Sequence, residues 1–149
     1  MLLLSPAFRD GEYIPLKYTC DGSDINPPLE IQNVPSAAKS LALIVDDPDA
    51  VGGVVFTHWL VWNIAPSTSV IKEESVPPGA SEGINDGGKV GYMGPCPPDT
   101  KPHRYRFRLF ALSHTLSLPE HTSKDALEAE IRSCVLEEAE LIGLYQRQT

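Results

Sequence analysis

The sequence predicts a mostly-β chain with one peripheral helix, and three observations lead to this class. Short apolar runs rich in β-branched and aromatic residues have the character of buried strands. Proline and glycine, 14 and 11 of the 149 residues, are spread along the chain and mark many turns. One stretch has a convincing helical pattern. Because short strands joined by turns must cover their apolar faces, the natural solution is an antiparallel β-sandwich.

Four segments are predicted as strands. Residues 41–45 (LALIV) are continuously apolar, so we expect a strand that is buried on both faces. Residues 54–64 (VVFTHWLVWNI) combine β-branched and aromatic side chains. Residues 104–112 alternate between polar and apolar, and residues 29–31 form a short candidate after two prolines.

The helix is predicted over residues 123–131. Ser123 is a suitable N-cap, and Leu127 and Ile131 form an apolar pair four residues apart. Residues 135–145 are ambiguous, since their Glu and Ala content favours a helix whereas the run LIGLY favours a strand.

Composition limits the possible partners. The length fits one domain, and the formal net charge of −8 argues against nucleic acid and against an anionic membrane surface. No segment approaches the roughly 20 apolar residues of a membrane span. The Leu2-Leu3-Leu4 run is too short for a signal sequence, so we expect a cytoplasmic protein.

The chain has three cysteines, Cys20, Cys96 and Cys134, without a CxxC spacing. An odd number of cysteines without a CxxC spacing fits neither a disulfide framework nor a zinc motif. We therefore expect reduced and mostly buried thiols.

A loop dense in glycine and proline, residues 83–102, leads directly into His103 and Arg104 at the start of a strand. Glycine-rich loops free backbone N–H groups for a ligand, and a His-Arg pair adds positive donors. This combination indicates a small anion pocket. Alternatively, the loop is a rigid connection, and Arg104, Arg106 and Arg108 form a solvated strand face.

Two further motifs are compatible with a site. The sequence Asp47-Pro48-Asp49-Ala50 follows a predicted strand, where sites are often built, but Asp-Pro also favours a plain turn. His58 lies inside an apolar strand and is either a core imidazole or a donor at a pocket floor. Strict alternation places His58 on the same face as Leu60 and Trp62.

Taken in order, these motifs resemble the phosphatidylethanolamine-binding protein family, also called Raf kinase inhibitor-like proteins, in its bacterial and archaeal branch. The resemblance covers nearly the whole chain. Its landmarks are YTCDG at 18–22, PPL at 27–29, DPDA at 47–50, HWLVWNI at 58–64, GIND at 83–86, GYMGPCPP at 91–98, HRY at 103–105 and AELIGLY at 139–145.

The resemblance implies one domain over residues 1–149, built as a sandwich of a large and a small sheet, with residues 135–145 finishing as a strand. It implies an anion pocket for phosphate-like groups or acetate at one end. The implied pocket residues are Asp47, Asp49, His58, Gly94, Pro98, His103 and Tyr105. Two departures are residues 99–102, where the family often has a glycine-containing turn, and Ser133-Cys134, where many members have Gly-His.

The expected function is binding of a small anionic ligand rather than catalysis, with no cofactor and no metal. Three alternatives stay open. One is a hydrolase with Cys96 as nucleophile, His58 or His103 as base and Asp47 as the group that orients the base. Another is a metal site of Asp47, Asp49, His58 and His103. The third is a protease or kinase inhibitor acting through an unidentified protein partner. A homodimer also stays open.

Overall fold

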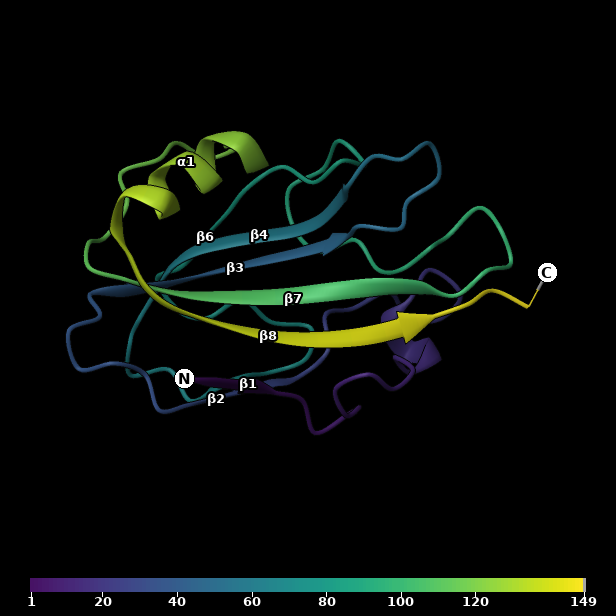
Figure 1. The fold of residues 1–149 in the computed structure, drawn as a ribbon, viewed down its shortest axis with the longest axis horizontal. Helices are drawn as coiled ribbons and strands as arrows, with labels where there is room; N and C mark the ends of the chain where they lie inside the picture. The colour runs from purple at the N-terminus through teal and green to yellow at the C-terminus, as the bar shows by residue number, and fades with distance from the viewer. Residues whose placement is uncertain (149) are drawn as a thin grey trace.

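The computed structural model describes residues 1–148. They form two antiparallel sheets and one α-helix, which packs against the large sheet (Figure 1). The large sheet has the order β6-β4-β3-β7-β8 and the small sheet β1-β2-β5. The large sheet consists of β3 (Ser40–Asp47), β4 (Phe56–Ile64), β6 (Ser81–Glu82), β7 (His103–Leu112) and β8 (Val135–Tyr145). The small sheet consists of β1 (Leu2–Leu4), β2 (Leu29–Gln32) and β5 (Val70–Ile71). A 3₁₀ turn, Leu16–Tyr18, and helix α1, Lys124–Cys134, complete the elements.

This architecture confirms the predicted fold class, a mostly-β sandwich of a large and a small sheet with a peripheral helix. The four predicted strands form at β2, β3, β4 and β7, and the ambiguous 135–145 segment is strand β8. Ser123 caps α1 by accepting a hydrogen bond from the N–H of Ala126. No helix in residues 1–148 combines the length and the apolar character that crossing a membrane requires.

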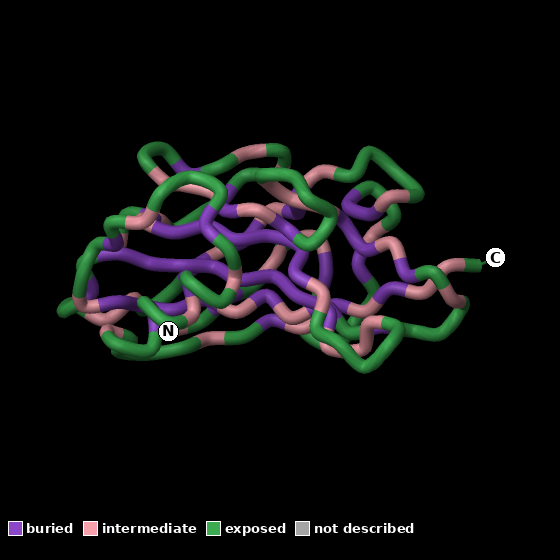
Figure 2. The backbone as a smooth tube through the Cα atoms, turned by 90° about the horizontal axis from the view of Figure 1, so that it is seen from above, coloured by how far each residue is buried: buried purple, intermediate pink, exposed green. Residues whose placement is uncertain are grey.

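Strand β3 is buried on both faces, as its continuous apolar run predicts. On one face, Leu43 and Val45 belong to the core between the two sheets, together with Ile31 of β2. On the other face, Ile44 packs in a second core beneath α1, together with Leu127. Figure 2 shows the buried backbone in the middle of the molecule, enclosed by exposed loops.

A β-bulge interrupts the pairing of β3 with β4 at His58. Val45 pairs with Trp59 but Asp46 pairs with Thr57, so His58 is an extra residue on β4. A bulge turns the side chains beside it away from regular alternation. The prediction that His58 shares a face with Leu60 and Trp62 is therefore wrong, because these two pack beneath α1 whereas His58 packs against Tyr105 of β7.

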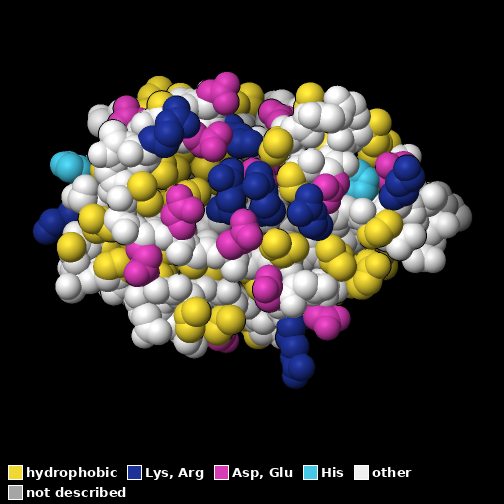
Figure 3. All heavy atoms as spheres, in the orientation of Figure 1, with side chains coloured by type: hydrophobic (Ala, Val, Ile, Leu, Met, Phe, Trp, Pro, Cys, Tyr) yellow, Lys and Arg dark blue, Asp and Glu magenta, His cyan; other side chains and the backbone are white. Residues whose placement is uncertain are grey.

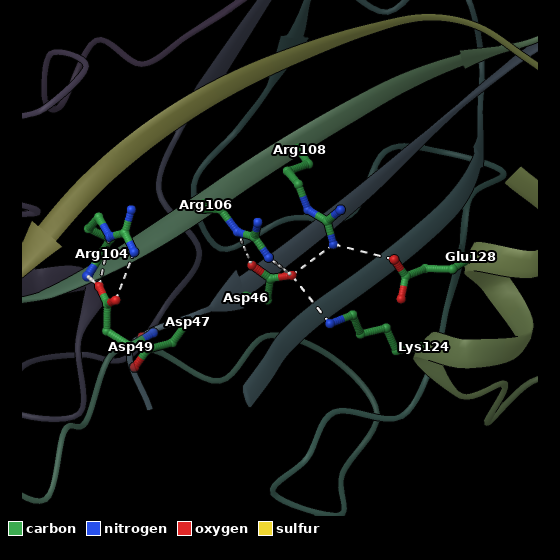
Figure 4. A network of polar contacts seen from close by, with 8 residues as sticks. All are labelled: Asp46, Asp47, Asp49, Arg104, Arg106, Arg108, Lys124 and Glu128. Atoms are coloured by element: carbon green, nitrogen blue, oxygen red, sulfur yellow. Dashed lines mark hydrogen bonds and ion pairs between the residues drawn. The ribbon is translucent and has the colours of Figure 1, made fainter. Parts of the chain in front are cut away.

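The outer face of the large sheet carries an ion cluster around Asp46, whose carboxylate is fully buried. Arg106 and Arg108 donate hydrogen bonds to it, and Lys124 of α1 lies 3.4 Å away (Figure 4). Figure 3 shows Lys and Arg side chains gathered near the middle of this face. The arginine-bearing face is thus only partly solvated. Two of its arginines compensate a buried carboxylate.

Candidate functional site at one end of the sandwich

A cavity of about 180 Å³ lies where β3 ends and β7 begins. Its walls come from four places in the chain: the end of β3 with the loop after it, the start of β4, the 93–98 loop and the start of β7. The lining residues are Asp47, Ala50, Val51, Val54, Phe56, His58, Met93, Cys96, Pro97, Pro98, His103 and Tyr105. The lining is therefore mostly apolar, with four polar side chains that carry any hydrogen-bonding chemistry.

Five of the seven predicted site residues line this cavity, namely Asp47, His58, Pro98, His103 and Tyr105. Asp49 does not. Its carboxylate accepts hydrogen bonds from the Arg104 Nε and Nη2 atoms at 2.9 and 2.8 Å (Figure 4). These hydrogen bonds lower the pKa of Asp49 to about 2. Asp49 is thus the ion-pair partner of Arg104 on the rim.

Gly94 is also absent from the cavity lining, and a close backbone contact explains the residue type there. A Cβ atom at this position would lie 2.5 Å from the carbonyl oxygen of Tyr18. The N–H of Gly94 donates to the Asp24 carboxylate at 2.8 Å. Gly94 therefore fixes the loop that forms the cavity wall.

His103 is buried between two carboxylates. Its Nδ1 lies 2.7 Å from Asp47 Oδ2, and its Nε2 lies 2.8 Å from Asp99 Oδ1. Burial alone would lower the pKa of His103, but the hydrogen bonds to Asp47 and Asp99 outweigh it and raise the pKa. Asp99 is not among the site residues that the sequence predicts. The only signal was that it begins the 99–102 segment, which departs from the family pattern.

His58 is 4% exposed, and its Nδ1 lies 2.6 Å from the carbonyl oxygen of Met93. A carbonyl oxygen only accepts, so Nδ1 carries the hydrogen in this contact. Burial lowers the pKa of His58, although Met93 and Asp47 act in the opposite direction. Near neutral pH the ring is therefore neutral, and Nε2 is a hydrogen-bond acceptor.

Tyr105 lies between the two histidines and is 1% exposed. Its ring meets the His58 ring edge-on, with centroids 5.2 Å apart. Its hydroxyl is buried and has no hydrogen-bond partner within residues 1–148. Burial raises the pKa of Tyr105, so the hydroxyl keeps its hydrogen. A buried hydroxyl without a partner costs about 1–3 kcal/mol. Tyr105 thus has an unused hydrogen-bond donor.

Two of the three cysteines form a disulfide, which corrects the expectation of reduced thiols. Cys20 and Cys96 are joined, with Cα atoms 5.4 Å apart and a sequence separation of 76, while Cys134 is free. The fold brings the pair together, so local spacing gave no sign of it. Cys96 lines the cavity, but a disulfide sulfur is not a thiolate. The alternative of a Cys96 hydrolase therefore lacks its nucleophile.

The four residues considered for a metal do not converge. Within residues 1–148 no group of three or more His, Cys, Asp or Glu side chains is arranged to hold an ion. His103 has both ring nitrogens engaged by carboxylates, and Asp49 is engaged by Arg104. Three of the four candidate ligands, Asp47, Asp49 and His103, are thus already engaged in hydrogen bonds or ion pairs.

Comparison with known proteins gives concordant matches over the full length. The profile of the family described as phosphatidylethanolamine-binding protein matches residues 4–146. A UPF0098 protein of Methanothermobacter thermautotrophicus is 48% identical, with 99% of each chain covered. A Chlamydia trachomatis crystal structure, described as a putative phosphatidylethanolamine-binding protein homologue, has a TM-score of 0.93 at 41% identity, covering 99% of this chain and 97% of that one. Escherichia coli YbcL, described as a new member of the mammalian family, has a TM-score of 0.93 at 28% identity, covering 99% of this chain and 98% of that one.

Proposed function

We propose, from the premise that this chain belongs to the phosphatidylethanolamine-binding protein family, that its cavity binds a small phosphorylated or carboxylated ligand. The observation that carries this proposal is the Tyr105 hydroxyl, a buried donor on a residue that lines the cavity, and this hydroxyl lacks a protein partner within residues 1–148. Such groups are rare in folded proteins and call for a partner, which a ligand oxygen would supply.

The hydrogen atoms at the cavity restrict the form of the ligand. Neutral His58 offers an acceptor at Nε2, and the Asp47 carboxylate offers only acceptors, so Tyr105 is the free donor among them. A ligand with both an O–H and an acceptor oxygen satisfies this set, and a monoprotonated phosphate or phosphomonoester has both. A fully ionised anion binds here together with one proton, which is taken up by His58.

The proton requirement sets the direction of the pH dependence. Because the pKa of His58 is lowered in the free protein, binding of an anion without its own proton strengthens as the pH falls. His103 and Arg104, the His-Arg pair that the sequence offers as positive donors, are not free for this role, because both His103 nitrogens contact carboxylates and Arg104 is bound to Asp49.

The apolar lining supports a ligand with an organic part. Val51 and Val54, each 59% exposed, stand at the cavity beside Phe56 and Met93. Apolar walls with a few polar groups are typical of small-molecule sites. Phosphatidylethanolamine, after which the family is named, contains a phosphate attached to organic groups. Its phosphodiester carries no O–H near neutral pH, so it would bind with the proton on His58. Regulation through a protein partner, a homodimer and a cytoplasmic location stay predictions from the sequence.

Replacement of Tyr105 by phenylalanine tests this proposal. Tyr105→Phe removes the hydroxyl and keeps the ring, so we expect about a tenfold loss of affinity for inorganic phosphate in calorimetry. The fold should tolerate the change, since the hydroxyl has no partner within residues 1–148.

Tyr145→Phe is the matched control. It also removes a tyrosine hydroxyl from the same sheet, but this one donates to Asp21 and does not belong to the cavity. We expect Tyr145→Phe to leave the phosphate affinity unchanged. Equal affinities in the native protein and Tyr105→Phe would refute the proposal.

A further inference from the structure

His103 lines two hollows. One is the cavity, and the other is an open groove of about 670 Å³ that includes Asp49, Asp99, Lys101 and Arg104. The ring contacts a carboxylate with each nitrogen: Nδ1 lies 2.7 Å from Asp47, and Nε2 lies 2.8 Å from Asp99.

Two carboxylates at hydrogen-bond distance define the protonation state of the ring. Ionised carboxylate oxygens accept and do not donate, so each ring nitrogen must carry a hydrogen for both contacts to be hydrogen bonds. A neutral ring would turn a nitrogen lone pair toward one of the carboxylates. The geometry therefore requires an imidazolium, and both of its N–H groups are already used.

The other groups around the ring do not change this conclusion. Tyr105 stacks beside it at 6.4 Å, and Tyr145 is its pairing partner on β8. Of the cations on the rim, Arg104 is bound to Asp49, and the Lys101 side chain is exposed. The Lys101 backbone N–H donates to the Asp99 carboxylate at 3.3 Å and helps to hold it in place.

We propose that Asp99 is a positioning residue that keeps His103 as an imidazolium, so that His103 balances the charge of Asp47 at the cavity wall and does not contact the ligand. Nε2 faces Asp99 and not the cavity floor, and Asp99 itself lines the groove. Without the second carboxylate, His103 loses its proton at a lower pH, and Asp47 then faces the cavity as an uncompensated negative charge.

The direct test is an NMR titration of the His103 ring protons in the absence of ligand. In the native protein we expect a midpoint well above the ordinary value of about 6.5. Asp99→Asn keeps the side-chain size and one acceptor oxygen, and we expect it to lower the midpoint by about one pH unit. Asp99 is partly exposed, so the variant should fold.

Asp49→Asn is the matched control, because it removes a carboxylate from the same groove that binds Arg104 and not His103. We expect Asp49→Asn to lower the His103 midpoint by much less than Asp99→Asn does, because Asp49 acts on His103 through space and Asp99 through a hydrogen bond. A native midpoint near the ordinary value, or equal midpoints in the native protein and Asp99→Asn, would overturn the proposal.

A second measurement rests on the proposed function and uses acetate, which stays ionised above about pH 5.5. As the pH rises through the lowered His103 midpoint of Asp99→Asn, we expect its acetate affinity to fall. This fall should be about tenfold greater than the fall in the native protein over the same pH range. If acetate and phosphate bind neither protein, the proposed function fails, while the ligand-free titration still decides the role of Asp99. If both bind with the same pH profile in both proteins, the positioning role fails alone.

Discussion

At the scale of single residues, the chemistry of the cavity depends on where the hydrogens are. His58 is neutral because burial lowers its pKa, whereas the raised pKa of His103 keeps a proton between two carboxylates. Residue types alone could not separate these cases, because both are histidines in or beside apolar strands. The sequence predicts both rings as site residues, but only the burial of His58 and the two carboxylates beside His103 distinguish their protonation states.

The two histidines should act on stability in opposite directions. The folded-state pKa of His58 is lowered, so the unfolded chain binds more protons, and stability is lost as the pH falls below about 6.5. The folded-state pKa of His103 is raised, so its contribution is complete below about 6.5 and is lost as the pH rises through the raised value. We expect the free energy of unfolding to be largest near pH 6.5, as measured by urea denaturation between pH 5.5 and 8.5.

Two variants assign the two limbs of that curve. His58→Gln should flatten the loss of stability on the acidic side, and His103→Gln should flatten the loss on the alkaline side. A native curve that rises or falls steadily across the whole range would contradict the opposite shifts.

At the scale of elements, strands β3 and β7 were predictable. Burial on both faces requires a continuous apolar run, as in β3, and burial on one face requires alternation of polar and apolar residues, as in β7. The orientation of His58 was not predictable. The bulge depends on how β4 pairs with β3, and this pairing cannot be read from β4 alone. Strands β1, β5 and β6 contain two or three residues each, too few for periodicity to show.

The 93–98 loop forms one cavity wall, and a disulfide anchors it. Cys96 lies between Pro95 and Pro97, which have no N–H to donate. The Pro95 carbonyl accepts a hydrogen bond from the Cys20 N–H at 3.1 Å, and the Cys96–Cys20 bond adds a covalent anchor at the same place. Because the sequence separation of the cysteines is 76, the bond also restricts the unfolded chain strongly. The disulfide thus connects the wall of the cavity to the stability of the fold.

Replacing both cysteines, Cys20→Ser with Cys96→Ser, should lower the free energy of unfolding by up to about 4 kcal/mol. It should also weaken phosphate binding, since the wall loses its anchor. Chemical denaturation and calorimetry measure the two effects. Cys134→Ser replaces the free cysteine, which does not line this cavity, and should change neither quantity. Unchanged stability in the double variant would show that the disulfide is not a structural anchor.

At the scale of the whole molecule, the order of the motifs was more informative than any one of them. The resemblance to the phosphatidylethanolamine-binding protein family, built on motifs that were weak individually, is confirmed by the family match over residues 4–146. The apolar side of the cavity could not be predicted in the same way. Val51, Val54 and Met93 lie outside the strands, and only the folded chain brings them beside the polar group of His58 and Tyr105.

The most direct test of the central claim is a crystal structure of the protein with inorganic phosphate. We predict phosphate in the cavity, with its oxygens at about 2.7–3.2 Å from the Tyr105 hydroxyl and His58 Nε2 and with the His103–Asp99 contact intact. Phosphate bound only in the groove beside Lys101 and Arg104, with nothing bound at Tyr105, would contradict the account.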